Sequence, residues 1–216
     1  MLDQVLRARL GPGLERAAGR LEAGGVPPAA LTGVGLLAGL AACICVATAS
    51  WAAALGLWLL NRLLDGLDGA VARLQGATEL GGVLDFVADF FVYSGFVFGV
   101  AVAHPGARLA CVALLAAYLV NNVALLSFSS VIERRGLALG DQRSLRLLPG
   151  LAEGTETIVV YILFCVLPAS STVIAWAFAA LVAVTAVQRV ADAVRTLIPL
   201  TPRSPQTRSV SRHSDV

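Results

Sequence analysis

Four aspartates stand close together in an otherwise apolar part of the chain: Asp65, Asp68, Asp85 and Asp89. The first two are three residues apart and the last two are four apart, so each pair shares one face of a helix. Carboxylate oxygens are hard ligands that suit magnesium, manganese or calcium. The spacing therefore predicts two helices whose carboxylates meet around metal ions.

The aspartates belong to a longer pattern, Asp65-x2-Asp68-Gly69-x2-Ala72-Arg73-x7-Gly81-x3-Asp85-x3-Asp89. This pattern resembles the signature of the CDP-alcohol phosphotransferase family, and every fixed position is filled. The similarity extends over about residues 27–195. Pro28-Ala29-Ala30-Leu31-Thr32 also resembles the Pro-Asn-x-Leu-Thr sequence that precedes the family's first span, with Ala29 in place of the asparagine.

The resemblance implies an enzyme that transfers a phosphatidyl group from CDP-diacylglycerol to a small alcohol and releases CMP. It implies a set of site residues that divides into three roles. The metal ligands for two Mg²⁺ or Mn²⁺ ions would be Asp65, Asp68, Asp85 and Asp89; the cytidine-phosphate site would contain Gly69, Ala72 and Arg73; and the general base would be Asp89. Members of the family commonly form homodimers, so the resemblance also implies a homodimer.

The composition places these residues in a membrane protein. Of 216 residues, 57% are hydrophobic and only 14% are charged, whereas soluble domains carry about 25% charged residues. Six apolar segments are each long enough to cross a core about 30 Å thick. They run over about residues 31–50, 51–64, 80–103, 109–132, 151–167 and 172–194. The predicted fold is all-α, with six transmembrane helices.

Aspartates inside a bilayer need compensating charge. On insertion scales, an aspartate at the centre of a membrane helix raises the free energy of insertion by about 2.5 to 3.5 kcal/mol. Arg73 alone cannot balance four carboxylates, whereas divalent cations can. By the helical rise of about 1.5 Å per residue, both aspartate pairs lie at a similar depth in the cytoplasmic leaflet.

The arginines predict the orientation. Fifteen of the sixteen basic residues fall on one side of the predicted membrane, and only Arg108 falls on the other. Those fifteen include Arg62 and Arg73, the four arginines of the loop at 133–150, and arginines at both ends of the chain. Because positive residues are retained in the cytoplasm, both termini and the site are predicted to be cytoplasmic, in a bacterial inner membrane.

The predicted organisation has three parts. Residues 1–26 form a cytoplasmic amphipathic juxtamembrane helix, broken at Gly11-Pro12-Gly13. Residues 27–197 form the six-helix domain. Residues 198–216, rich in Ser, Pro, Thr and Arg, form a disordered cytoplasmic tail.

The acceptor is the least constrained part of the prediction. Some relatives carry a Gly-Arg-x-Glu-Arg-like pattern at the start of the fifth segment, where this chain keeps Gly154 and Glu156 but has Thr155 and Thr157. Loss of these arginines counts against inositol phosphate. Candidate acceptor residues are Glu156, Thr157, Arg134 and Arg143. Glycerol 3-phosphate is the default acceptor by resemblance, and serine, inositol or its phosphate, choline and phosphatidylglycerol remain open.

Two other classes of protein are weighed against the enzyme. An ion-coupled transporter predicts a path open to both faces, whereas the carboxylates gather toward one face. In an inactive membrane scaffold, residues of the motif would be expected to be replaced, whereas every fixed position of the motif is filled here. The net charge of +2 gives no indication of a nucleic-acid partner, and the expected partners are CDP-diacylglycerol, a small alcohol and membrane lipids.

Overall fold

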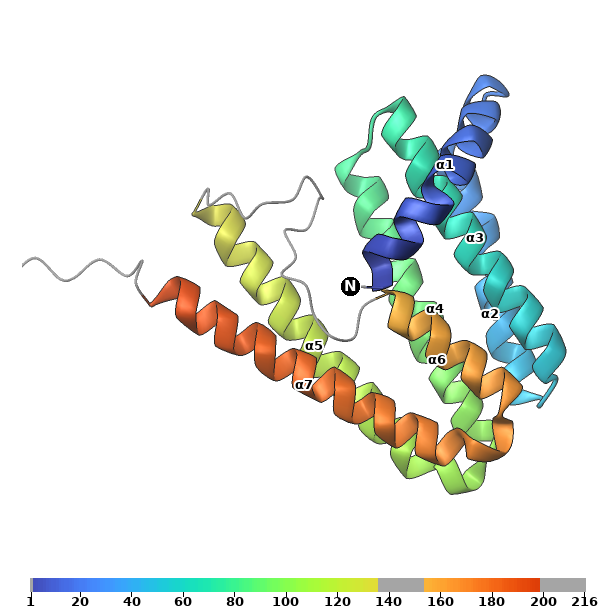
Figure 1. Ribbon diagram of the computed structural model, residues 1–216, viewed down its shortest axis with the longest axis vertical. Coiled ribbons are helices and arrows are strands. Elements are labelled where there is room, and N and C mark those ends of the chain that lie inside the picture. Colours follow the sequence, from blue (N-terminus) through green and yellow to red (C-terminus); the bar gives the residue numbers. More distant parts are fainter. Residues whose placement is uncertain (1, 136–153, 199–216) are drawn as a thin grey trace, which may run out of the picture.

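The computed structural model describes residues 2–135 and 154–198, and all regular structure within these two ranges is helical (Figure 1). Within each of these ranges, the longer helices are connected by short loops or by the single 3₁₀ turns η1 and η2. The elements are α1 (Leu2–Ala23), α2 (Pro28–Ala47), α3 (Trp51–Gln75), α4 (Glu79–Ala103), η1 (Pro105–Ala107), α5 (Arg108–Arg134), α6 (Gly154–Val166), η2 (Pro168–Ser170) and α7 (Ser171–Leu197). The all-α prediction is confirmed.

Within residues 2–135 and 154–198, four helical stretches are long and apolar enough to cross a membrane: α2, α4, η1 with α5, and η2 with α7. The sequence predicts six spans, and the two others correspond to α3 and α6. Helix α3 ends in the charged run that carries Asp65 and Asp68, and α6 has only 13 residues. The first three residues of the predicted fifth segment lie outside the described residues. Spanning by α3 and α6 therefore stays a prediction.

Helices α2, α3, α4 and α6 form one bundle around an aromatic core. Trp58 of α3, Phe96 of α4 and Tyr161 and Phe164 of α6 are fully buried in it. Small residues bring α2 and α4 together, as glycines do in membrane helices: a Cβ added to Gly39 would lie 2.5 Å from Cγ2 of Val92. This close contact fixes α4, and with it Asp85 and Asp89, against α2.

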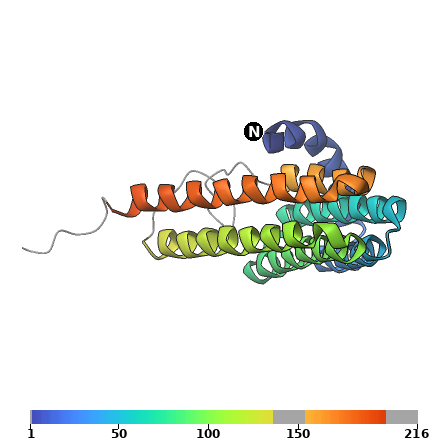
Figure 2. The same cartoon turned by 90° about the horizontal axis from the view of Figure 1, so that it is seen from below.

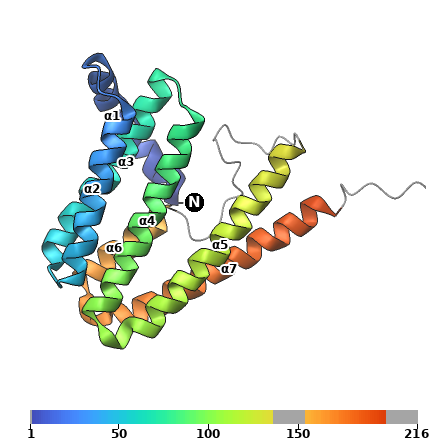
Figure 3. The same ribbon diagram turned by 180° about the vertical axis from the view of Figure 1, so that it is seen from behind.

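Helices α5 and α7 form a second unit and lie side by side along their length (Figures 1 and 2). Their ribbons diverge from the α2–α4 bundle and meet it near η1 and η2 (Figure 3). At the junction the hydroxyls of Tyr118 in α5 and Tyr161 in α6 lie 3.2 Å apart, and Tyr118 packs edge-on against Phe178 of α7. The α5/α7 pair is therefore anchored to the bundle through an aromatic contact.

Helix α1 corrects one prediction. The sequence predicts a break at Gly11-Pro12-Gly13, but α1 continues from Leu2 to Ala23 with Pro12 inside it. A proline removes one backbone hydrogen bond and bends a helix without necessarily ending it. The turns that follow are held in place because Ala18 is fully buried in a cluster with Leu31, Ala70 and Val71. This packing keeps α1 against α3, close to the aspartates.

Candidate metal and catalytic site

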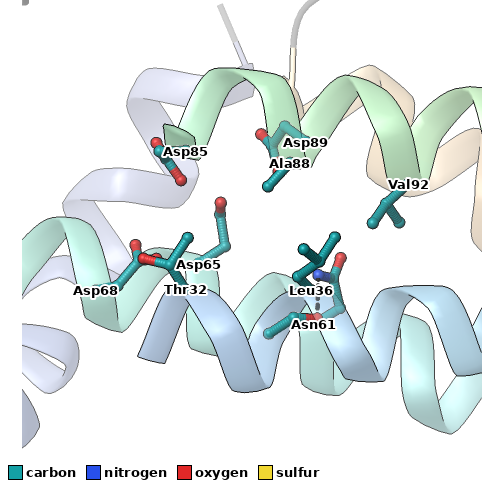
Figure 4. Close-up of a pocket in the computed structure, with 10 residues that line it drawn as sticks. Thr32, Leu36, Asn61, Asp65, Asp68, Asp85, Ala88, Asp89 and Val92 are labelled. Atoms are coloured by element: carbon teal, nitrogen blue, oxygen red, sulfur yellow. Dashed lines mark hydrogen bonds between the residues drawn. The ribbon is translucent and has the colours of Figure 1, made fainter. Parts of the chain in front are cut away.

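Three of the four aspartates meet between α3 and α4. Carboxylate oxygens of Asp65, Asp68 and Asp85 all lie within 4.8 Å of one another. Figure 4 shows Asp65 pointing from α3 toward α4, between Asp85 and Asp89. Because two helices that run in opposite directions contribute to the cluster, its geometry depends on their packing as well as on the motif.

Neighbouring side chains hold this cluster in place. The hydroxyl of Thr32 in α2 donates to Oδ2 of Asp68 at 2.8 Å, and Asp68 is only 4% exposed. Thr78 caps the start of α4 by accepting a hydrogen bond from the backbone N–H of Gly81 at 3.1 Å. The Thr32 bond connects the beginning of the first apolar helix to the aspartate motif.

Asp89 lines the same pocket but has different partners. Its Oδ1 accepts a hydrogen bond from Nη2 of Arg62 at 2.7 Å, and its Oδ2 accepts one from the hydroxyl of Tyr93 at 3.2 Å. Asp89 is not part of the group of three carboxylates whose oxygens converge. The structure thus divides the four aspartates into a cluster of three and a single aspartate bonded to an arginine and a tyrosine.

Arg62, Tyr93 and Asn61 are site residues that the sequence alone does not identify, and Arg62 is the charged one. The charge pattern indicates only that Arg62 is on the cytoplasmic side, but its side chain is only 8% exposed and lies inside the bundle. It also lies 3.6 Å from Oδ2 of Asp65. The available signal was its position in α3, three residues before Asp65 and one turn after Trp58, on the face that carries the motif.

The predicted nucleotide residues follow the cluster along α3. Arg73 is exposed, and its Nη1 lies 3.5 Å from the position of a Cβ added to Gly69, so the guanidinium folds back over that glycine. Ala72 is half-buried in the same turn. This arrangement places a positive charge and a bare stretch of backbone just beyond Asp68, and nucleotide binding by these residues stays a prediction.

The three predicted acceptor residues that the structure describes do not line the aspartate pocket. Among the described residues, its lining comes from α2, α3 and α4. Glu156 and Thr157 are in the first turn of α6, with Thr157 buried, and Arg134 is exposed at the end of α5. Arg143 lies outside the described residues. Their role in acceptor binding stays a prediction.

Comparison with known proteins decides the family. The sequence model of CDP-alcohol phosphatidyltransferases matches residues 26–190. The chain belongs to the CDP-alcohol phosphatidyltransferase family. It is also 40% identical over 175 residues to an inner membrane protein of Escherichia coli strain K12, an alignment that covers 78% of this chain and 84% of the relative. The resemblance deduced from the motif is confirmed, and with it the enzyme class.

Solved structures of phosphatidylinositol phosphate synthase from Mycobacterium tuberculosis share the fold. The structure with CDP-DAG bound has a TM-score of 0.66 and 23% identity, covering 84% of this chain and 93% of the synthase. The structure in complex with manganese and citrate has a TM-score of 0.65 and 23% identity, covering 83% of this chain and 88% of the synthase. At this identity the likeness shows the family's fold.

The donor set of this family member fits a divalent cation. Three carboxylates from two helices offer oxygen atoms at mutual distances that one ion can span, and oxygen-only donor sets suit Mg²⁺ and Mn²⁺. Burial of Asp68 adds to the fit, because a carboxylate held away from water requires a compensating charge.

Proposed function

We propose that this protein transfers the phosphatidyl group of CDP-diacylglycerol to a hydroxyl of a small alcohol and releases CMP. The observation that carries the proposal is the convergence of Asp65, Asp68 and Asp85 beside Asp89 in one pocket. Family membership supports the chemistry. The CDP-DAG bound to the mycobacterial synthase of similar fold supports the donor.

The three converging carboxylates are the proposed ligands of the divalent metal, Mg²⁺ or Mn²⁺. Manganese in a structure of the mycobacterial synthase supports this assignment. When bound, such an ion neutralises the diphosphate and stabilises charge on the leaving oxygen. Gly69 and Ala72 give the cytidine phosphate close access to α3, and Arg73 supplies a positive charge beside it.

Asp89 is the proposed general base. It takes the proton of the acceptor hydroxyl, and the acceptor oxygen then forms a bond to the phosphorus that carries the diacylglycerol. The bond from that phosphorus to the oxygen of CMP breaks, and CMP leaves with the electron pair. The position of Asp89 beside the three-carboxylate cluster supports its role as the base, because the base must face the acceptor hydroxyl.

The proposed setting is the bacterial cytoplasmic membrane, with the site and both termini in the cytoplasm. The description of the Escherichia coli relative as an inner membrane protein and the four apolar helices support the location. In the proposed arrangement α3 and α6 complete six spans within residues 27–197. The homodimer implied by the family stays a prediction.

Glycerol 3-phosphate is the proposed acceptor, with Glu156, Thr157, Arg134 and Arg143 as the candidate residues that bind it. Loss of the arginines at positions 155 and 157 argues against inositol phosphate. Serine, inositol or its phosphate, choline and phosphatidylglycerol are the alternatives that the assay must include.

The test is an assay of purified protein with labelled CDP-diacylglycerol, Mg²⁺ or Mn²⁺, and a panel of these acceptors. CMP release that depends on one acceptor and stops after chelation of the metal would support the proposal and name the acceptor. Asp89→Asn should lower turnover by about 100-fold or more while the Kd for CDP stays within about threefold. Wild-type turnover in that variant would remove Asp89 as the base.

A further inference from the structure

A groove with a volume of about 610 Å³ runs between α5 and α7. Among the described residues, its lining consists only of alanine and valine side chains, such as Ala116 and Val120 of α5 and Ala183 and Val187 of α7. Such small side chains leave the space between the two helices unfilled. A water molecule takes up about 30 Å³ and a methylene group is of similar size, so the groove has room for one acyl chain of a phospholipid.

The groove faces away from the bundle and the aspartate pocket. Tyr118 faces the bundle, because its hydroxyl lies 3.2 Å from that of Tyr161 in α6. Ala116 and Val120 are each two residues from Tyr118, which places them about 200° around α5 from it. The open side of the groove is therefore on the outer surface of the α5/α7 pair.

This outer surface lies in the membrane. Both η1 with α5 and η2 with α7 are long and apolar enough to span a bilayer. Val187 and Val190, which line the groove, are 70% and 50% exposed. In a spanning segment, exposed valines of this kind contact acyl chains rather than water. The position of the groove therefore favours a lipid as its occupant.

Charged side chains lie beyond one end of the groove. Helices α5 and α7 both begin at the junction with the bundle and run in the same direction, so their last turns lie together (Figures 1 and 2). Arg195 is one turn beyond Ala191, which lines the groove, and Arg134 is in the last turn of α5. Both arginines are exposed. An apolar groove that leads to two arginines matches an acyl chain joined to an anionic headgroup.

Neighbouring acidic residues leave this end of the groove positive. Nη1 of Arg195 lies 3.7 Å from Oδ1 of Asp192, but a guanidinium has five N–H donors, so further donors are available for a phosphate. The charged residues in the last two turns of the two helices are three arginines and two acids: Arg134, Arg135 and Arg195, with Glu133 and Asp192. A negative headgroup is therefore favoured over a zwitterionic one.

We propose that the α5/α7 groove binds one anionic phospholipid of the surrounding bilayer, with an acyl chain in the groove and the phosphate between Arg134 and Arg195. A second copy of the chain is the other candidate occupant. In a twofold dimer that pairs this groove with itself, two concave surfaces of small residues would face each other and leave the space unfilled. The inference does not depend on the proposed function, because the groove is separate from the aspartate pocket.

Lipid binding to the purified protein tests the inference. Dioleoyl-phosphatidylglycerol or dioleoyl-phosphatidylcholine, which have the same acyl chains, is titrated in neutral detergent and followed by native mass spectrometry. The wild-type protein should retain one phosphatidylglycerol with a Kd about tenfold or more below that for phosphatidylcholine. The double variant Arg134→Gln with Arg195→Gln should reduce this preference to within about threefold.

A second pair of variants tests the place of the acyl chain. Ala183→Phe fills the groove and should raise the Kd for phosphatidylglycerol by about tenfold or more. Ala177→Phe is the matched control, because Ala177 is exposed about 120° around α7 from Ala183, and its Kd should stay within about threefold. If Ala183→Phe fails to fold, Ala183→Leu should still raise the Kd by about threefold.

Four results would each overturn the inference. The first is equal affinity of the wild-type protein for the two lipids, and the second is an equal loss of affinity in Ala183→Phe and Ala177→Phe. The third is loss of phosphatidylglycerol binding in Asp68→Asn, which would place the lipid in the aspartate pocket. The fourth is a dimer that Ala183→Phe converts to monomers at an unchanged Kd for lipid, which would make the groove an interface between copies. Absence of CMP release would defeat the proposed function and leave this inference standing.

Discussion

The α2–α4 region and the α5/α7 pair use polar residues in different ways. In the α2–α4 region most of the buried polar groups near the aspartates are bonded: Thr32 to Asp68, Asn61 to Gly35, and Arg62 to Asp89. Nε1 of Trp58 is the exception there among the described residues, since it is buried without a hydrogen-bond partner. In the α5/α7 pair, Oδ1 of Asn121 and of Asn122 and Oγ of Ser129 are buried without a hydrogen-bond partner in the described part of the chain. Polar groups that are hydrogen-bonded within the protein already have fixed positions, as a catalytic site requires.

The pockets of the two regions also differ in polarity. The α2–α4 pocket is lined by carboxylates, whereas a groove between α5 and α7 is lined by small apolar residues. The lining of that groove comprises Ala116, Ala117, Val120, Ala183, Ala186, Val187, Val190 and Ala191. The proposed function places the chemical step in α2–α4, and substitutions in both regions can test this division.

The largest expected effect is in the metal-ligand cluster. Asp68→Asn removes the charge of a proposed metal ligand that is 4% exposed and bonded to Thr32. CMP release should fall by about 1,000-fold, because metal ligation and the charge balance of the pocket fail together. Asp192→Asn in α7 is the control and should retain activity within about twofold. Similar activity in the two variants would remove the distinction between the regions.

A large effect on stability is expected where α2 and α4 touch. Gly39→Ala places a Cβ 2.5 Å from Cγ2 of Val92 and 3.0 Å from Nδ2 of Asn61, so the helices must move apart. The cost should be about 1 to 3 kcal/mol, seen as a lower Tm in detergent. Gly33→Ala is the matched control on α2, since a Cβ there meets nothing within 4 Å. Equal Tm values would show that the close contact is not needed.

Much of the site was predictable because its residues lie in one local pattern. Helical spacing alone paired Asp65 with Asp68 and Asp85 with Asp89, and the structure brings the two pairs into one pocket. The division of the four aspartates was not predictable, because it depends on Arg62 and Tyr93, which the packing of α3 on α4 brings together. An arginine near a membrane boundary has the same sequence signal whether it faces lipid headgroups or a carboxylate.

For the fold as well, the local elements were predictable and the contacts between them were not. Apolar length identified α2, α4, α5 and α7 as helices able to cross a membrane. The continuous course of α1 through Pro12 was not predictable, because burial of Ala18 beside Ala70 and Val71 is a tertiary contact. The junction of α5 and α7 with the bundle also depends on long-range aromatic packing of Tyr118 with Tyr161 and Phe178.

A moderate effect is expected from the bond that joins α2 to the cluster. Thr32→Val keeps the shape of the side chain but removes the hydroxyl that donates to Asp68 at 2.8 Å. The apparent Kd for Mn²⁺ should rise by about 3- to 30-fold, because such supporting bonds orient metal ligands. Thr185→Val is the control, since its hydroxyl donates to the Leu181 carbonyl of its own helix at 3.0 Å. A shift of equal size in both variants would contradict a supporting role for Thr32.

The smallest effect is expected in α5, and it bears most directly on the comparison. Asn121→Leu replaces a side chain that is 7% exposed and whose Oδ1 has no partner among the described residues. Replacing an unsatisfied buried acceptor by an apolar group of similar size is nearly neutral or stabilising by about 1 kcal/mol. The Tm should therefore stay level or rise, and kcat should change by less than about twofold. The informative measurement is the KM for the acceptor alcohol. An unchanged KM leaves the chemistry and its substrates with the α2–α4 region. A rise of about tenfold would mean that the amide oxygen binds the acceptor, so that the two regions share one active site.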